Sequence, residues 1–151
     1  MNKECIRLIK ENKAKVLGRW HESVLAFFPE KMHTGTPLAQ ALSKVLGDVL
    51  DAMEGSPETL HEALNKVSRI LAVQNFPPSR SMSLFFELKS ILRETAPGTI
   101  RQKHWEEFQT GMEHLTLEAF DSYMAHREKI YQLKVEESKR QTFMMSRRAK
   151  A

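Results

Sequence analysis

The chain has 151 residues, of which 41 % are hydrophobic and 28 % charged, with a formal net charge of +4. This length suits one domain, and the composition excludes a chain that is disordered throughout. No apolar run approaches the roughly 20 residues that cross a bilayer, so no membrane span is expected. The charged first residues lack the apolar region of a signal peptide. A single cysteine, Cys5, excludes an internal disulfide, and together these features predict a cytoplasmic protein.

Apolar residues at three- and four-residue steps predict an all-α fold. The first helix is expected from about Lys3 to Phe28, with a weak point at Gly18 and a stop at Pro29. Thr36-Pro37 and Ser56-Pro57 each combine a capping residue with proline at the first helical position. These two pairs therefore predict the starts of the second and third helices.

Proline also delimits the remaining helices. Asn75-Phe76-Pro77-Pro78 must break the chain, because neither proline can donate a backbone hydrogen bond. The fourth helix is expected from Pro78 to Ala96, and because it is apolar on more than half of its circumference it should be central and covered on two sides. From Ile100 onward the chain has no proline and only one glycine, Gly111, which predicts one very long helix, or two with a bend near Gly111.

The last predicted helix carries an apolar stripe that a second copy of the chain is expected to cover. Its members are Trp105, Phe108, Met112, Leu115, Ala119, Tyr123 and, further on, Ile130. Residues 126–151 contain eight Lys or Arg against three Glu. We therefore expect a helical domain over residues 1–125 and a basic helical extension over residues 126–151.

The sequence has no motif for nucleotide, metal or nucleophile chemistry: no Gly-rich phosphate loop, His-Glu-x-x-His or Cys-x-x-Cys. No two of the six histidines lie four residues apart, which favours solvated helix faces over metal ligands. Cys5 is interpreted as a bystander thiol, with a redox switch as the alternative. Trp20, Phe85, Phe86 and Trp105 are expected to fill the core, with a ligand pocket as the alternative. No enzyme activity and no cofactor are expected.

A polar cluster surrounds the Pro-Pro corner, formed by Arg69, Gln74, Ser79 and Arg80 together with Asn75 and Ser81. Unpaired N–H groups and the helix dipole at the start of the fourth helix favour a bound anion there. A capped turn between two helices is the competing interpretation.

Two segments resemble the N-terminal domain of the RsbRD family, the co-antagonists of RsbT in bacterial stress-signalling complexes. They are residues 69–89, with the corner Ala72-Val-Gln-Asn-Phe-Pro-Pro-Ser79, and residues 119–140, with Arg127-Glu-Lys-Ile-Tyr131 followed by Glu137-Ser-Lys-Arg140. The resemblance implies a globin-like bundle of about five to seven helices that works as a sensory homodimer without haem. In the family the final helix leads into a STAS output domain. This chain ends at Ala151, so the output is expected in a separate protein.

The resemblance also bears on haem. Haem-binding sensor globins place a histidine a few residues before the corresponding corner, which here falls near Leu71. No histidine lies between His61 and His104, so the usual protein ligand to the iron is missing.

These observations predict a non-catalytic sensory, regulatory or protein-interaction module. It should form a homodimer and signal through its C-terminal helix to a separate protein partner. One alternative is a nucleic-acid-binding protein that uses the basic tail, although that tail has few aromatic side chains for stacking on bases beyond Phe143. The other alternative is a helical protein that binds a small ligand in its core.

Overall fold

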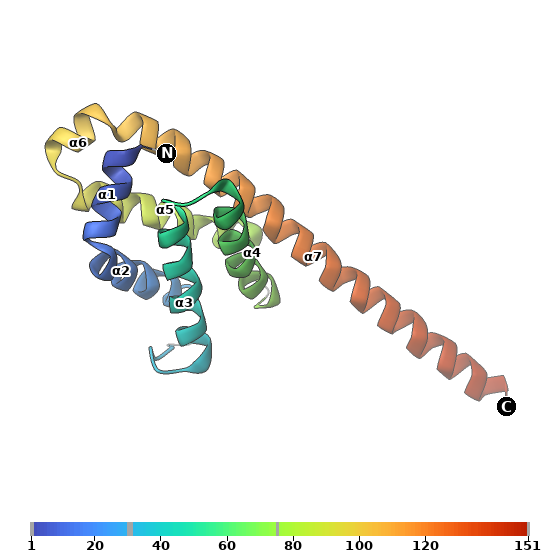
Figure 1. The fold of residues 1–151 in the computed structure, drawn as a ribbon. Helices are drawn as coiled ribbons and strands as arrows, with labels where there is room; N and C mark the ends of the chain where they lie inside the picture. The colour runs from blue at the N-terminus through green and yellow to red at the C-terminus, as the bar shows by residue number, and fades with distance from the viewer. Residues whose placement is uncertain (1, 30–31, 75, 151) are drawn as a thin grey trace.

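The computed structural model describes residues 2–29, 32–74 and 76–150, and within these ranges the fold is built from helices without a strand (Figure 1). The seven helices are α1 (Lys3–Glu11), α2 (Lys13–Leu25), α3 (Pro37–Ala52), α4 (Pro57–Val73), α5 (Pro78–Thr95), α6 (Gly98–Lys103) and α7 (Trp105–Lys150). The all-α fold class and the long C-terminal helix are thereby confirmed. Asn75, at the predicted corner, lies outside the described residues.

The proline-marked helix starts form as predicted. The Thr36 hydroxyl oxygen accepts a hydrogen bond from the backbone N–H of Ala39 at 3.2 Å, and the Ser56 hydroxyl oxygen accepts one from Thr59 at 3.2 Å. Proline follows each cap, at a position where its missing N–H would have no partner inside the helix. Both starts were therefore readable from local chemistry alone.

The first and last predicted helices are each divided at a residue that the pattern did not mark. Asn12 separates α1 from α2, with φ −115°, and both its backbone N–H and its side-chain amide donate to the Leu8 carbonyl. The helix continues through Gly18, the expected weak point, and α2 ends at Leu25. In the last segment the break falls at His104, with φ −124°, and α7 runs through Gly111 without interruption.

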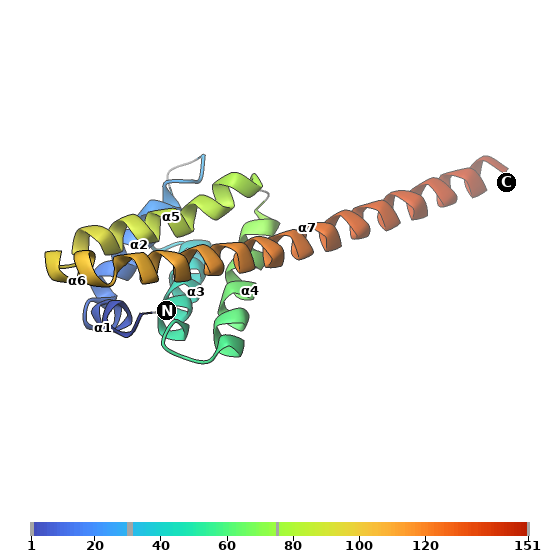
Figure 2. The same ribbon diagram turned by 90° about the horizontal axis from the view of Figure 1, so that it is seen from above.

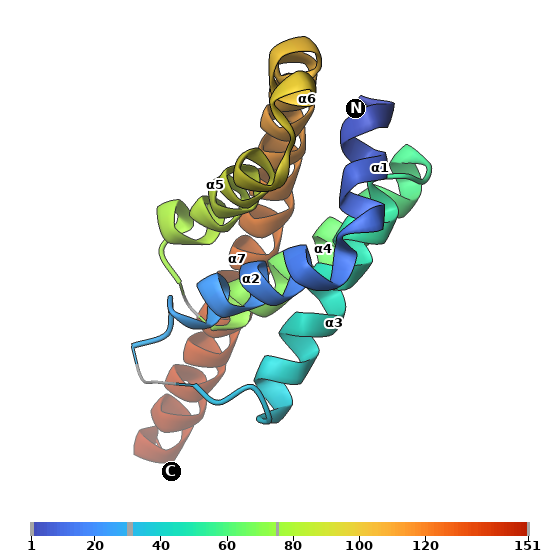
Figure 3. The same cartoon turned by 90° about the vertical axis from the view of Figure 1, so that its left-hand side faces the viewer.

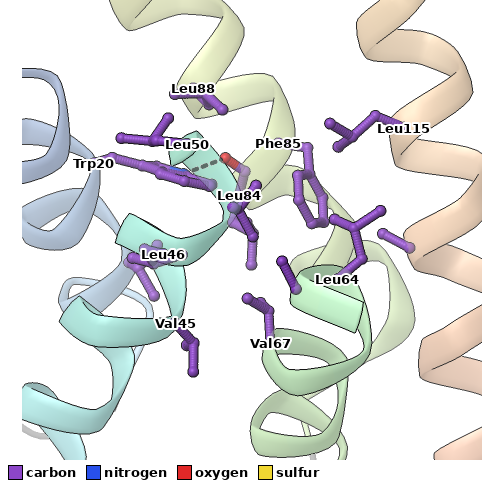
Figure 4. Close-up of a cluster of buried hydrophobic side chains, with 14 of the residues drawn as sticks. Trp20, Val45, Leu46, Leu50, Leu64, Val67, Leu84, Phe85, Leu88 and Leu115 are labelled. Atoms are coloured by element: carbon purple, nitrogen blue, oxygen red, sulfur yellow. Dashed lines mark hydrogen bonds between the residues drawn. The ribbon is translucent and has the colours of Figure 1, made fainter. Parts of the chain in front are cut away.

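We call helices α1–α6 together with the first half of α7 the body. Helix α5 contacts both α2 and α7, so two helices cover it as predicted, but it is not central, because one of its faces, which includes Phe86, is exposed. The Trp20 indole N–H donates to the Leu84 carbonyl at 2.8 Å, and the Trp20 and Phe85 ring centroids lie 6.3 Å apart. Figure 4 shows these side chains among apolar residues of α3 and α4, with Leu115 approaching from α7. Trp20 and Phe85 thus belong to the core, whereas the Phe86 side chain is 52 % exposed.

Helix α7 begins inside the body and ends outside it. The views in Figures 2 and 3 place its first half beside α5, and α6 joins the two helices at one end. From Tyr131 to Lys150 every residue is exposed, and this part of the helix projects away from the other six. We call residues 131–150 the arm. The helix passes the expected domain boundary at residues 125–126 without a break.

The start of the described chain is fastened to the start of α7. The Asn2 side-chain oxygen caps α1 by accepting from the backbone N–H groups of Glu4 and Cys5. Its side-chain amide donates to the Glu107 carboxylate at 2.9 Å and lies 3.2 Å from Nδ1 of His104. One side chain therefore caps the start of α1 and binds the start of α7.

Replacement of Trp20 should test how far the body depends on this core. Trp20→Ala removes a fully buried ring and leaves the Leu84 carbonyl without the indole donor, so we expect the free energy of unfolding to fall by about 3–5 kcal/mol. Urea denaturation followed by circular dichroism measures this change. Trp105→Ala, at a partly buried tryptophan, is the matched control and should cost less. An equal loss at both positions would contradict the assignment.

Candidate functional site

The predicted dimer stripe on α7 is mostly part of the chain's own core. Its five central members are buried, with exposed fractions of 2 % or less, while Trp105 and Ile130 are partly buried against the same core. The buried members are Phe108, Met112, Leu115, Ala119 and Tyr123. They contact the body of their own chain and have no surface left for a second copy. Along this buried half of α7, any surface offered to a partner must lie on the other faces of the helix.

The site that best links the body to the arm is a groove where α7 leaves the α4–α5 corner. We call it the exit groove; its volume is 360 Å³, and it is lined by Phe76, Pro77, Pro78, Tyr123, Met124, Arg127 and Tyr131. The Tyr123 hydroxyl donates a hydrogen bond to the Phe76 carbonyl, both in the interior. The two prolines start α5 and Tyr123 lies on α7, so this contact couples the corner to the long helix.

Arg127 joins three parts of the exit groove. Its guanidinium donates to the Ala72 carbonyl at 3.0 Å, in the last turn of α4, where carbonyl groups lack helical partners and the helix dipole is negative. It also donates to the Tyr131 hydroxyl at 3.2 Å and lies 5.0 Å from the centre of the Tyr131 ring. Arg127 therefore caps α4 and holds the first residue of the arm.

A row of polar contacts continues along the interface between α4 and α7, the most extensive helix pair of the body. The Asn65 side-chain oxygen accepts from the Ser122 hydroxyl at 3.1 Å and faces Nε2 of His126 at 2.7 Å. Further along, Nδ1 of His61 lies 2.9 Å from the Glu118 carboxylate. Polar contacts of this kind fix one register between two helices that apolar packing alone would hold less specifically.

His126 is a titratable group in this row, and its protonation would weaken the packing of α7 against α4. Its burial lowers the pKa of the imidazole below the ordinary 6.5, and the positive charges of Arg69 and Lys129 lower the pKa further, while contact with Asn65 acts in the opposite direction. The neutral imidazole donates from Nε2 to Asn65. A protonated ring would place a third positive charge beside Arg69 and Lys129, which weakens the α4–α7 contact.

The predicted anion-binding residues do not share a single set of contacts. Arg69, Gln74, Ser79 and Arg80 are all exposed. The Arg80 guanidinium donates to the Phe27 carbonyl at 3.2 Å, just beyond α2, while Arg69 lies near His126 of α7. The two arginines thus serve different neighbours, and a bound anion at this corner stays a prediction.

His21 and Cys5, two further candidate residues from the sequence, both lie in the interior. His21 was expected on a solvated face, but it is 9 % exposed, and its Nε2 lies 2.7 Å from the Ala39 carbonyl at the start of α3. It lines a surface pocket of 450 Å³ beside α2 together with Gly18, Glu22, Leu25, Ala26, Met32 and Thr34.

Burial raises the pKa of the Cys5 thiol, as do the charges of Glu107 and Glu4, which disfavours the reactive thiolate.

The described residues also bear on haem, metal ions and membranes. Leu71, at the place where the family comparison would put a haem ligand, is buried in the core. Among the described residues, no three His, Cys, Asp or Glu side chains come together in a way that could hold a metal ion. In the same part of the chain, no helix combines the length and the apolar character that a membrane crossing requires.

The match to known proteins covers most of this architecture. Residues 14–137, which include the exit groove and the first turns of the arm, match the family described as the RsbT co-antagonist protein rsbRD N-terminal domain. The chain belongs to this family. It is also similar to an uncharacterized protein of the archaeon Archaeoglobus fulgidus, with 30 % identity over 137 residues that span 89 % of each chain. No solved structure matches the chain. The RsbRD relationship assigns the chain to a regulatory class of domain.

Sequence reasoning missed Asn65, Ser122 and His126 as a group. Ser122 and His126 lie four residues apart and therefore on one helix face, which was the available signal. Their common partner Asn65 lies on α4, more than fifty residues earlier, and only the packing of the two helices identifies it.

The His126 contact predicts a pH dependence of stability. Because the folded chain holds the pKa of His126 below 6.5, the unfolded chain binds the proton more readily. The free energy of unfolding should be unaffected by this group above pH 6.5 and should fall as the pH drops from 6.5 toward the folded pKa. Urea denaturation of the wild type and of His126→Gln, which retains a donor for Asn65, between pH 8 and pH 5 isolates this difference.

His114→Gln, at an exposed histidine of the same helix, is the control for that comparison. It should follow the wild-type pH profile. If His126→Gln also follows it, His126 does not contribute to the acid sensitivity of the α4–α7 contact.

Proposed function

We propose that the protein is a non-catalytic regulatory module that acts as a homodimer and passes a signal through α7 to a separate protein partner. Membership of the RsbRD N-terminal domain family supports a regulatory role. The observation that carries the proposal is the division of one continuous helix into a half built into the core and a fully exposed arm.

A continuous helix supports transmission because it moves as a rigid element. The arm has 20 residues, so at the α-helical rise its tip lies roughly 30 Å beyond the exit groove. A small rotation of α7 against α4 would therefore become a larger displacement at the tip. The hydrogen bonds of Asn65 and Arg127 are suited to such a change, since two packed helices can shift between discrete arrangements.

The exposure of the arm supports a protein partner. Most of the stability of helices in proteins comes from the packing of an apolar face, so the exposed arm gains stability when another surface covers it. The line of core-facing residues continues onto the arm through Leu133 and Met144, which are 57 % and 53 % exposed. A shallow apolar depression of 360 Å³ follows this line and is lined by Ile130, Leu133, Lys134, Glu137, Ser138 and Gln141. This is the face we assign to the separate partner.

The polar side chains at the α4–α7 interface bind other groups of the protein, which supports a non-catalytic role. His61, His126 and Arg127 bind residues of the opposite helix or backbone carbonyl groups at the α4–α7 interface. Their chemistry is used to set helix register and does not converge on a space where a substrate could react.

The basic arm supports nucleic-acid binding as a second candidate, since six of its exposed residues are Lys or Arg. Such binding would weaken steeply with salt, because neutralised phosphates release counterions. Gel shifts with the full chain and with the combined variant Arg147→Gln, Arg148→Gln and Lys150→Gln test this candidate. Absence of a shift by the full chain at low salt removes it.

The homodimer and the partner are tested together on the full chain. Light scattering should give twice the chain mass of 17.5 kDa at micromolar concentration. Affinity capture from the native cell, followed by mass spectrometry, should recover a partner that Leu133→Ser loses and Val73→Ser retains, since both are exposed apolar residues but only Leu133 lies on the arm. A monomer at all concentrations contradicts the dimer. Equal capture by both variants contradicts the assignment of the partner to the arm.

A further inference from the structure

An exposed apolar stripe runs along the face of α7 that points away from the body. Its members are 37–64 % exposed and are Leu117, Phe120, Met124, Tyr131 and Val135. At about 100° of rotation per residue, they gather on one side of the helix, roughly 130° around from the buried line. We call this set the outer stripe. It begins beside the body and continues onto the arm, and large apolar side chains in a continuous row on a solvent-facing helix mark an interaction surface.

Four of the five members of the outer stripe are placed symmetrically about the midpoint between Arg127 and Glu128. Phe120 and Val135 lie equally far from this midpoint, as do Met124 and Tyr131. A two-fold axis makes residue i of one copy contact residue j of the other, and residue j contact residue i. In an antiparallel pair of α7 helices crossing at this midpoint, Phe120 would therefore face Val135 of the other copy and Met124 would face Tyr131, while Leu117 would face Ser138.

The charges of α7 are separated in the same way. Residues 105–125 contain five carboxylates and no Lys or Arg, whereas residues 126–150 contain eight Lys or Arg and three Glu. An antiparallel pair places the acidic half of one helix beside the basic half of the other. A parallel pair places like charges together along the whole length, which is unfavourable.

The charges and the apolar side chains of α7 contribute differently to the pairing of two copies. Exposed ion pairs contribute little each and are screened over about 8–10 Å at ordinary salt, so the charges select an orientation more than they supply affinity. The apolar side chains supply the affinity, because water leaves them when the two stripes meet. The symmetry of the stripe and the separation of charge agree on the same orientation.

We propose that α7 pairs with α7 of a second copy of this chain in an antiparallel arrangement, outer stripe against outer stripe, with the two-fold axis at Arg127–Glu128. This inference rests on the homodimer of the proposed function and adds its surface and its direction. Each arm then lies along the acidic half of the partner copy's α7. Met124 and Tyr131, which line the exit groove, come close to the axis, so the groove of each copy adjoins the dimer contact.

Distance measurement between spin labels tests the direction of pairing. Ser146→Cys in a Cys5→Ala background carries one label near the tip of the arm. An antiparallel pair separates the two labels by roughly 55 Å along the axis at 1.5 Å per residue, whereas a parallel pair brings them within about 20 Å at the usual interaxial distance. Glu128→Cys, beside the proposed axis, should give a short distance and serves as the positive control.

These measurements distinguish the antiparallel arrangement from the existence of the homodimer. A long distance at residue 146 with a short one at residue 128 is the expected result. Short distances at both positions overturn the antiparallel arrangement and leave the homodimer intact, while a monomer in light scattering overturns both. If Cys5→Ala loses helical circular dichroism, the native Cys5 is kept, since its thiol is 4 % exposed and escapes labelling.

Substitutions on α7 test the surface itself. Phe120→Ser removes a ring from two symmetry-related contacts and should raise the dimer dissociation constant at least about tenfold. Phe143→Ser is the matched control, because this exposed phenylalanine of the same helix lies on a different face. The dissociation constant of the wild type should also rise with salt. An unchanged constant in Phe120→Ser, an equal effect in Phe143→Ser, or tighter association at high salt would each contradict the proposed surface.

Discussion

The fold depends on the burial of the first half of α7 between α4 and α5. Phe108, Leu115 and Tyr123 are almost completely buried there, so removal of α7 would expose the apolar faces of two other helices. Because of this contact the last helix belongs to the core and is more than an appendage to it. The same contact sets the direction of the arm, since α7 continues through the exit groove without a break.

At the interface of α7 with α4 and α5, apolar contacts supply stability and polar contacts fix the register of the helices. The buried side chains supply most of the stabilisation, because each removes a large apolar area from water. They would tolerate small slips of one helix along the other, whereas the contacts of Asn65 and Arg127 are made in one register only. A regulatory module needs both properties, stability of the body and a small number of contacts that distinguish one arrangement from another.

The parts of the fold that could be predicted from sequence are those with a local cause. Thr36-Pro37 and Ser56-Pro57 start helices because a hydroxyl oxygen and a missing N–H act within one turn. The break at Asn12 was missed because the apolar spacing continues across it and the competing bonds to Leu8 are made by side chain and backbone together. The family could be predicted because the residues around the Pro-Pro corner form a run that resembles the RsbRD N-terminal domain.

The candidate site was harder to predict because spacing on one helix does not reveal which side of it is covered. Phe108 to Tyr123 form a regular stripe that suits a partner helix, but α4 and α5 of the same chain cover it. Leu117, Phe120 and Met124 form a second stripe on the same helix, and only the placement of the body distinguishes the two. Asn65 and His126 could not be paired without knowing that α4 lies against α7.

The link between Asn2 and Glu107 spans 105 positions of the chain, which has a consequence for the order of assembly. On the ribosome, α1 emerges long before Glu107, so this contact cannot form until the start of α7 has been made. Contacts between such distant residues carry a high loop-closure cost and slow the search for the native state. The apolar faces of α4 and α5 that α7 covers stay exposed until then, and chaperone access during translation would matter most in that interval.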